Sequence, residues 1–168
     1  MSRYPIICTK LAVSTSDQIH SFATIYHSFY PITPEKALNL DFLPETASKE
    51  PHLLTAILTV GAKDMPNGDH LLESCAQYMQ SLIAGIAAGR KCGVEAVEAL
   101  LLLAEWEPQC GLPEAMNLGC GQEDMAAWMH IGLALRLAYA LKLDRTMFRG
   151  DSRNRDSLAS REQLAWAG

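Results

Sequence analysis

The residues best suited to chemistry in this 168-residue sequence are its five cysteines and five histidines, which could bind a metal ion or form disulfides. No C-x-x-C pair and no H-E-x-x-H segment occurs among them, so their spacing does not indicate a metal site. The cysteine count is odd and no two cysteines are close, which favours a reducing compartment over a disulfide framework. We therefore expect no metal ion and no other cofactor in this chain.

Motifs for nucleophilic catalysis or phosphate binding are also missing. The sequence contains no G-x-S-x-G segment. Cys75 falls on an apolar stripe and is interpreted as a small buried hydrophobe, whereas Cys110 and Cys120 belong to a predicted loop and could be exposed thiols. The segment GCGQED at 119–124 resembles a phosphate loop. It lacks a third glycine and a lysine, and its two carboxylates would repel phosphate.

Three polar side chains in or beside apolar helices are candidates for contact with an effector or a partner. Arg136 interrupts LALRLAY, where a guanidinium should need an acidic partner or an aromatic ring, so a buried or half-buried structural ion pair is expected. His130 is interpreted as a core histidine bonded to a backbone carbonyl, and Glu105 as a salt-bridge or capping residue. If the three met at one open pocket, they would instead support a small helical enzyme.

The charge pattern argues against a domain that binds DNA by itself. The formal net charge is −5, and a DNA-binding domain would normally present a basic face. Residues 144–160 interleave arginines with acidic residues, which is typical of a charged, solvated linker. No secretory signal is recognisable at the start of the sequence, and Arg136 near the centre of the longest apolar stretch would cost about 3 kcal/mol or more in a bilayer. We expect a soluble protein.

Apolar residues recur every three or four positions almost throughout, which predicts an all-α, irregular multi-helix bundle within a single domain, 1–168. Segment 30–51 contains four prolines and is expected to be a loop, as is the glycine-rich stretch before Glu123. The predicted helices cover approximately residues 16–29, 51–63, 69–89, 94–106 and 123–145, with another starting at Arg161.

Smaller features of these helices give further expectations. Ile19, Phe22, Tyr26 and Phe29 should form the apolar face of the first helix, which Ser14, Ser16 or Asp17 could cap. The expected stripe of the third helix consists of Leu72, Cys75, Met79, Leu82, Ile83 and Ile86. Gly85 and Gly89 in that helix either let another helix approach or mark its end, and both alternatives stay open. Glu95 and Glu98 are expected on the solvated side of the fourth helix.

The segment EDMAAWMHIGLALRLAYALKLDR, 123–145, is apolar on nearly every side. Trp128, Gly132, Leu135 and Tyr139 share one face, and Ile131, Ala134, Ala138 and Leu141 line the next. A helix of this kind belongs in the middle of a helical bundle, so we expect it to be the central helix.

These segments resemble a known family in their order and spacing. EALLLLAEWEP at 98–108, followed by the helix at 123–145 and by a helix that starts at Arg161, is similar to the fungal-specific transcription factor domain. That domain is the middle homology region of fungal binuclear zinc-cluster regulators. The residues that carry the motif core are Trp106, Trp128, Gly132, Leu135, Arg136, Ala138 and Leu141. Upstream, FYPITPEKAL and EPHLLTAILTVGAK also fit, so the resemblance covers about residues 17–166.

The resemblance implies a regulatory domain of a nuclear transcription factor that acts on transcription by RNA polymerase II. It implies partners in other parts of a larger factor, in co-regulators or in a small-molecule effector. The sequence departs from the family pattern in several respects. It shows no basic linker and no dimerising coiled coil, and the family domain extends beyond the residues present here. The zinc cluster that would read DNA is absent, so zinc and DNA binding are implied only for longer relatives. LKLDR replaces the commoner LGLHR.

Two other function classes remain as alternatives, namely a small all-helical enzyme and a helical protein-interaction scaffold. An enzyme would need a convergent polar site, and a repeat scaffold would need a period of about 30–45 residues, which does not recur here. Leu164, Ala165 and Trp166 give the sequence an apolar end. We interpret this as a truncated family domain, which should expose the apolar side that further helices would cover.

Overall fold

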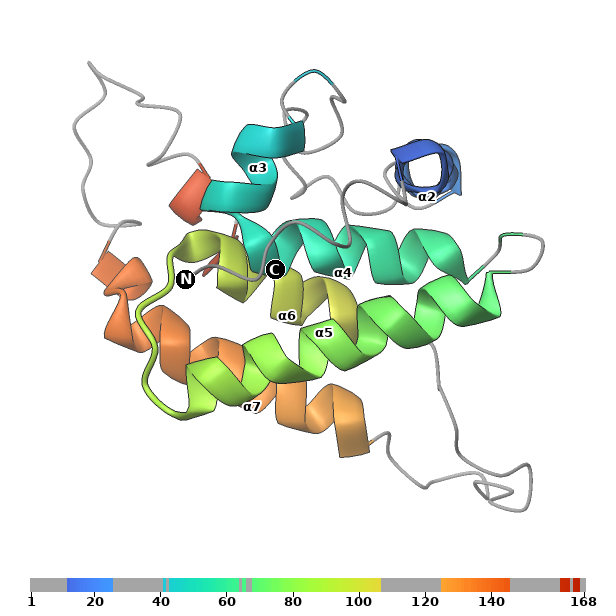
Figure 1. Ribbon diagram of the computed structural model, residues 1–168. Helices are drawn as coiled ribbons and strands as arrows, with labels where there is room; N and C mark the ends of the chain where they lie inside the picture. The colour runs from blue at the N-terminus through green and yellow to red at the C-terminus, as the bar shows by residue number, and fades with distance from the viewer. Residues whose placement is uncertain are drawn as a thin grey trace.

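The computed structural model describes residues 12–25, 41, 43–63, 65, 68–106, 125–145, 161–163 and 165–166. Every element within these ranges is helical and none is a strand, which confirms the all-α prediction (Figure 1). The elements are α2 (Ala12–Ile25), α3 (Leu43–Lys49), α4 (Pro51–Ala62), α5 (Asp69–Ala87), α6 (Val94–Trp106), α7 (Met125–Ala140) and the 3₁₀ turn η3 (Leu143–Arg145). Residues 161–163 and 165–166 are also helical, as expected from the start predicted at Arg161.

Two predicted boundaries were wrong near the N-terminal end. α2 begins at Ala12, so Ser14, Ser16 and Asp17 lie within the helix and do not cap it, and residues 26–29 fall outside the described ranges. The segment predicted as a proline-pinned loop contains α3. Pro44 lies in the first turn of α3, where a missing N–H breaks no helical hydrogen bond.

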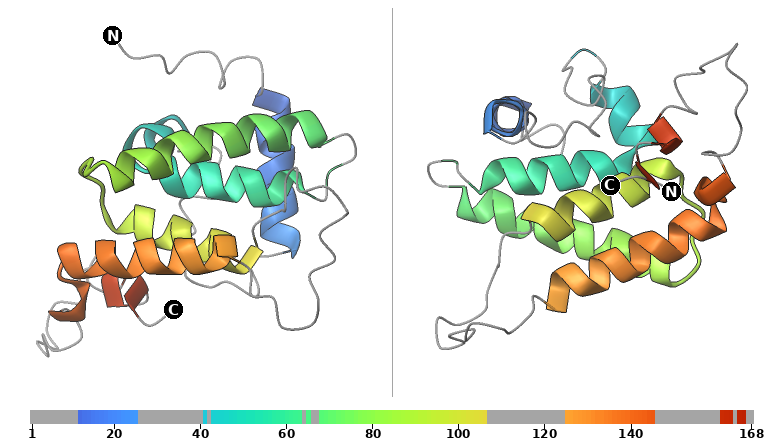
Figure 2. Two further views of the ribbon diagram at one scale, coloured as in Figure 1. Left: turned by 90° about the horizontal axis from the view of Figure 1, so that it is seen from below. Right: turned by 180° about the vertical axis from the view of Figure 1, so that it is seen from behind.

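α4 is the central helix of the fold. It contacts α2, α3, α5 and α6, and α6 in turn contacts α7. Leu53, Ala56, Ile57 and Val60 of α4 are fully buried, and its threonines satisfy their hydroxyls on backbone carbonyls one turn earlier. Figure 2 shows α4 and α6 between α5 and α7, with α2 crossing the α4–α5 pair.

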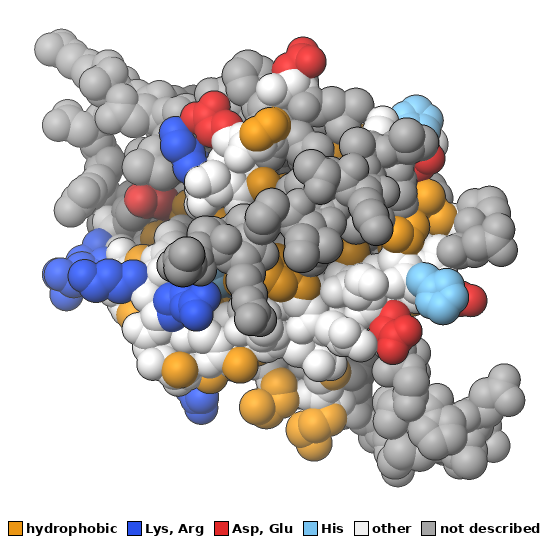
Figure 3. Space-filling view, viewed as in Figure 1, with side chains coloured by type: hydrophobic (Ala, Val, Ile, Leu, Met, Phe, Trp, Pro, Cys, Tyr) orange, Lys and Arg blue, Asp and Glu red, His pale blue; other side chains and the backbone are white. Residues whose placement is uncertain are grey.

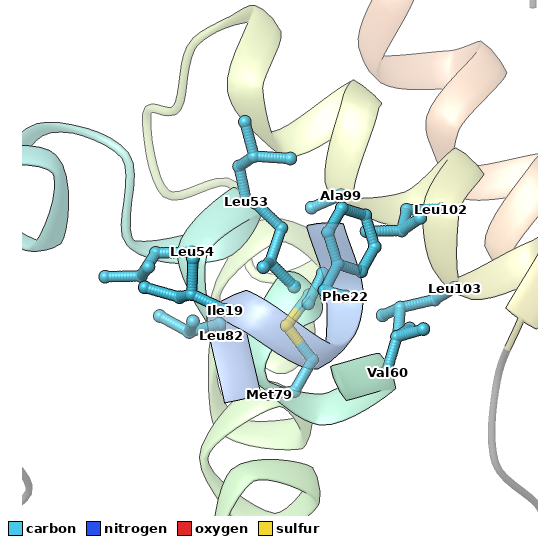
Figure 4. Packing of buried hydrophobic residues seen from close by; sticks show 12 residues of the cluster. Ile19, Phe22, Leu53, Leu54, Val60, Met79, Leu82, Ala99, Leu102 and Leu103 are labelled. Atoms are coloured by element: carbon cyan, nitrogen blue, oxygen red, sulfur yellow. The ribbon is translucent and has the colours of Figure 1, made fainter. Parts of the chain in front are cut away.

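The main core fills the space where these helices meet. Phe22 of α2 and Leu102 of α6 are fully buried there, beside Leu53 of α4 and Met79 of α5 (Figure 4). The predicted stripe of α5 is buried at Met79, Leu82 and Ile86 and half-buried at Leu72, Cys75 and Ile83. A second cluster, around Leu100 and Ala134, joins α6 to α7.

α2 and α4 approach closely at Gly61. A Cβ atom at this glycine would lie 2.2 Å from the backbone carbonyl oxygen of Gln18, which no real contact permits. The Gln18 side chain stabilises the same crossing by donating a hydrogen bond from Nε2 to the carbonyl of Leu58 at 3.0 Å. The crossing therefore requires a glycine.

The two glycines of α5 mark its C-terminal end. Gly89 has a φ of +84°, and its N–H donates to the Ile86 carbonyl, while the N–H of Arg90 donates to the Gly85 carbonyl. This pair of bonds is a Schellman cap, which uses glycine at the left-handed position. Of the two alternatives, the helix end is confirmed. A Cβ at Gly85 would meet the Arg90 side chain and not a second helix.

The prediction that the helix at 123–145 lies inside the bundle was wrong. α7 buries only His130, Ala134 and Ala138, against α6, while Trp128 is 55% exposed and Leu135 50% exposed. Hydrophobic side chains gather along the lower edge of the molecule, over α7 (Figure 3). A helix that is apolar all round can still lie at the edge of a bundle. Its own residues do not determine how many other helices pack against it.

Lys142, where the sequence departs from the LGLHR pattern, occupies a backbone position that favours glycine. α7 ends at Ala140, and Lys142 adopts a left-handed φ of +62° before η3. A lysine there costs about 1 kcal/mol relative to glycine because its Cβ crowds the backbone. We predict that Lys142→Gly raises the free energy of unfolding by about 1 kcal/mol in urea titrations. Lys63→Gly, at a right-handed position after α4, is the control and should lower it.

No described helix is both long and apolar enough to cross a membrane.

Candidate functional site: a buried ionic junction

Glu95 of α6 caps the first turn of α4. Its Oε2 accepts hydrogen bonds from the backbone N–H groups of His52 and Leu53, both at 3.1 Å. These two N–H groups have no partner within α4, because the first turn of a helix leaves its donors free. The negative carboxylate also faces the positive end of the helix dipole. α4 has no side-chain cap of its own, so α6 supplies it.

His52 completes this contact. Its Nδ1 lies 2.7 Å from Oε1 of Glu95, and both side chains are more than nine-tenths buried. Pro51 stands at the first position of α4, where proline starts a helix well, and this places His52 at the second position, next to the carboxylate. Both oxygens of Glu95 are therefore engaged by one turn of α4.

Arg161 connects the C-terminal helical residues to two further carboxylates. Its Nη1 and Nη2 donate to Oε1 and Oε2 of Glu50 at 2.7 and 2.9 Å. Its Nε donates to Oε1 of Glu98 at 2.7 Å, and Nη2 also donates to Oε2 of Glu98. One planar guanidinium thus forms two fork-shaped contacts, which a lysine could not reproduce. We call Glu50, His52, Glu95, Glu98 and Arg161 the ionic junction.

Burial sets the electrostatics of the junction. The Glu98 side chain is fully buried, and loss of water raises its pKa above the usual range, while the hydrogen bonds and charge of Arg161 oppose that rise. Burial alone would lower the pKa of Arg161, but its bonds to Glu98 and Glu50 outweigh burial and raise it. The positive charge of Arg161 is therefore what mainly offsets the cost of burying the Glu98 carboxylate away from water.

The junction is arranged to hold elements together. All six oxygens of its three carboxylates accept hydrogen bonds from α4 or from Arg161. It fixes the start of α4 to α6, and it fixes Arg161 and the helical residues beside it to both. Ala165 is buried in the second cluster, and Trp166 packs edge-on against Tyr139 of α7, with 5.4 Å between ring centroids. Within the described ranges, no group of three or more His, Cys, Asp or Glu side chains could hold a metal ion.

We predict that Glu95→Ala lowers the free energy of unfolding by about 2–3 kcal/mol. The change leaves two backbone N–H groups and the Nδ1 of His52 buried without an acceptor. Urea unfolding followed by circular dichroism measures this loss. Glu73→Ala removes an exposed glutamate of α5 and serves as the control, so a comparable loss there would contradict a specific role for the α4 cap.

The three candidate contact residues from the sequence do not meet in the structure. His130 is buried at 8% exposure on the α6 side of α7, as predicted. Arg136 is exposed, and no ion pair joins it to another described residue, so the expected buried or half-buried pair was wrong. Glu105 is exposed near the end of α6. As contacts for an effector or partner, all three stay predictions.

The motif-core residues fall into a buried or half-buried group and an exposed group. Ala138 is buried, and Trp106, Leu141 and Gly132 are half-buried. Trp128, Leu135 and Arg136 are exposed, which contradicts their placement in the interior. Of the thiols, Cys75 is half-buried, and burial raises its pKa. Cys110 and Cys120 lie outside the described ranges.

Sequence reasoning missed the ionic junction. It placed Glu95 and Glu98 on a solvated side, and it took the arginines after Leu143 for surface charge. One signal was available in the sequence. Two glutamates three residues apart share one face of a helix, and a helix that is apolar on all its other sides is expected to be buried all round, so these glutamates should need buried partners.

Residues 19–168 match the family described as "Fungal specific transcription factor domain". The chain belongs to this family. The match covers most of the sequence and confirms the resemblance seen in the motifs around α6 and α7. As a fungal-specific transcription factor domain, the chain is a regulatory domain of a fungal transcription factor, from a family that is not one of enzymes. No curated protein and no solved structure matches it.

Proposed function

We propose that this domain regulates transcription by RNA polymerase II in the nucleus and does not read DNA itself. The observation that carries the proposal is the family match over residues 19–168. The net charge of −5 supports a role without its own DNA contact, because an acidic chain repels phosphate backbones. DNA would then be reached only through a zinc cluster of a longer factor, and co-regulators or a small-molecule effector would contact this domain.

The ionic junction supports a mechanism for regulation. Arg161 bonds to Glu98 of α6 and to Glu50 at the start of α4, and in the proposed mechanism the segment that begins at Arg161 alternates between a docked and a released arrangement. An effector or partner that prefers one arrangement would shift the population, by its difference in affinity for the two. Masking or exposing an activating surface would follow from that shift.

Tethering tests the regulatory role. The chain is fused to an unrelated DNA-binding domain in a fungal cell, with its sites placed before an RNA polymerase II reporter. We expect the reporter output of the fusion to differ from that of the DNA-binding domain alone. Arg161→Met should change the output of the fusion, whereas Lys49→Ala, at an exposed position, should leave it unchanged. The same sites before an RNA polymerase III promoter control for polymerase specificity. Unchanged output on both activation and repression reporters would contradict the proposal.

DNA binding is tested with the isolated chain. Fluorescence anisotropy with random and selected duplexes at physiological salt should give no sequence-selective binding. Tight and selective binding would overturn the proposed division of labour.

A further inference from the structure

The exposed face of α7 carries a row of apolar side chains, which we call the α7 stripe. These large side chains are each at least half exposed and recur at helical spacing, as Met125, Trp128, Met129, Leu135 and Tyr139. They extend over about 20 Å of the helix. A Cβ at Gly132, in the middle of the stripe, would meet nothing within 4 Å, so no other described part of the chain covers it. A continuous apolar face of this kind is typical of an interaction surface.

A group of exposed cations lies at the C-terminal end of the α7 stripe. We call it the basic end, and it consists of Arg90, Lys91, Arg136, Lys142 and Arg145. The first two belong to the connection from α5 to α6. This connection reaches the end of α7, because Cys92 packs against the same cluster as Leu141 and Leu143. Figures 1 and 2 show the connection beside the end of α7, and Figure 3 shows Lys and Arg side chains gathered toward this end.

The basic end has a positive charge that its surroundings do not balance. Within residues 88–93 and 125–145, the only acidic side chain is Asp144. The C-termini of α5 and α7 add about half a negative charge each, so the five cations outweigh about two negative charges. No ion pair joins any of the five to another described residue. The chain as a whole has a net charge of −5, which makes this positive region a local exception.

We propose that the α7 stripe and the basic end together bind an amphipathic, acidic helix of another protein. The apolar side chains of that helix pack on the stripe around Trp128 and Leu135, and carboxylates toward one of its ends face the basic end. Helical peptides bind other proteins in this way, through apolar residues at i, i+3, i+4 and i+7. The inference rests on the proposed function in one respect, namely that a co-regulator contacts this domain.

Charge favours this occupant over three others. A second copy of the chain presents cations and no exposed carboxylate on the same face, so it does not complement the basic end. A DNA duplex or an anionic membrane is an extended surface, which would also come near the acidic remainder of the chain. A short acidic helix contacts only the region where the charge is positive.

Fluorescence anisotropy with three labelled peptides of about 20 residues tests the natural chain. The first has leucines at every third or fourth position and glutamates over its last two turns. The second has lysine in place of each glutamate, and the third has the composition of the first with the leucine spacing scrambled. We expect the first to bind at least about tenfold more tightly than the others, and to weaken about fivefold or more between about 0.05 and 0.5 M salt. Equal binding of the peptides, or no saturable binding up to about 1 mM, overturns the proposal.

Trp128→Ala tests the α7 stripe. The acidic peptide should bind this variant about tenfold more weakly or worse, because a large aromatic residue at the centre of an interface contributes much of the affinity. Gln80→Ala, at an exposed position of α5, should leave the affinity unchanged. Circular dichroism shows whether both variants keep the helical fold. An unchanged affinity for Trp128→Ala overturns the placement on α7.

Charge reversal tests the basic end. Lys91→Glu combined with Arg145→Glu reverses two charges that come from two separate elements. We expect this variant to bind the acidic peptide at least about tenfold more weakly than the natural chain does, and the lysine peptide more tightly. Lys49→Glu combined with Lys63→Glu changes the net charge equally at exposed positions elsewhere, and should alter neither affinity. Equal effects of the two pairs would show that net charge, and not the basic end, determines binding.

Two competitors separate the remaining occupants. Random duplex DNA and vesicles of phosphatidylserine and phosphatidylcholine are each added to the complex with the acidic peptide. Neither should displace the peptide at physiological salt, and displacement by either would assign the surface to that competitor. Peptide binding and the tethered reporter are separate measurements. A reporter that responds while no peptide binds contradicts this inference alone, whereas a reporter that does not respond contradicts the proposed function.

Discussion

Replacing Arg161 by methionine is expected to lower the free energy of unfolding by about 3–5 kcal/mol. The substitution keeps much of the side-chain volume but removes the guanidinium that four carboxylate oxygens face. It leaves Glu98, which is fully buried, as an uncompensated charge, and breaking one side of a buried ion pair has a penalty of this size. Urea unfolding with circular dichroism at pH 7.5 measures the difference.

The pH dependence of this variant identifies the cause. In the Arg161→Met chain, burial still raises the pKa of Glu98, and the guanidinium that lowered it is gone. The folded-state pKa then lies further above the unfolded one, so stability is fully present below the unfolded pKa and is lost as the pH rises through the folded pKa. The difference from the natural chain should be smallest at mildly acidic pH and should grow toward neutral pH.

A second substitution checks the interpretation. Adding Glu98→Leu to Arg161→Met removes the stranded carboxylate as well as its partner, and most of the lost stability should return, since apolar replacement of a buried pair is often close to neutral. If the double variant is no more stable than Arg161→Met alone, the penalty does not come from Glu98.

Gly61→Ala is the second substitution with a large expected effect, a loss of about 3 kcal/mol. The new Cβ would lie 2.2 Å from the Gln18 carbonyl oxygen, so α2 must move away from α4 and give up packing at Ile19 and Phe22. Thermal unfolding of the chain, followed by circular dichroism, measures the loss.

Gly132→Ala is the matched control, since both glycines are helical and only Gly61 lacks space for a Cβ. There we expect a gain of up to about 1 kcal/mol, the usual preference of a helix for alanine. Equal effects at the two glycines would show that backbone propensity, and not the α2–α4 contact, determines the response at Gly61.

Elements with strong local signals could be predicted from the sequence. The helices at Pro51, Asp69 and Val94 have the expected starts, because proline, turn residues and apolar periodicity act within a few residues. Cases that depend on distant partners could not be predicted in this way. The burial of Glu98 depends on an arginine 63 residues later, in a segment with the composition of solvated charge.

The exposure of α7 is a failure of the same kind. Trp128 and Leu135 have the residue types of a core, and only the arrangement of the other helices decides which side of α7 is covered. α3 is the opposite case, since prolines suggested a loop where Pro44 in fact lies in the first turn of a helix. Its position in the helix, and not its presence, determines what a proline does.

The separation of the junction residues along the chain has a consequence for folding during synthesis. Glu50 and Arg161 are 111 residues apart, so a growing chain exposes α4 and α6 to the cell long before the guanidinium is made. Until then, Glu98 stays ionised only if water reaches it, which keeps the contact between these two helices loose. The junction therefore forms only after Arg161 has been made, and a nascent chain stalled before that residue should be unusually sensitive to proteases.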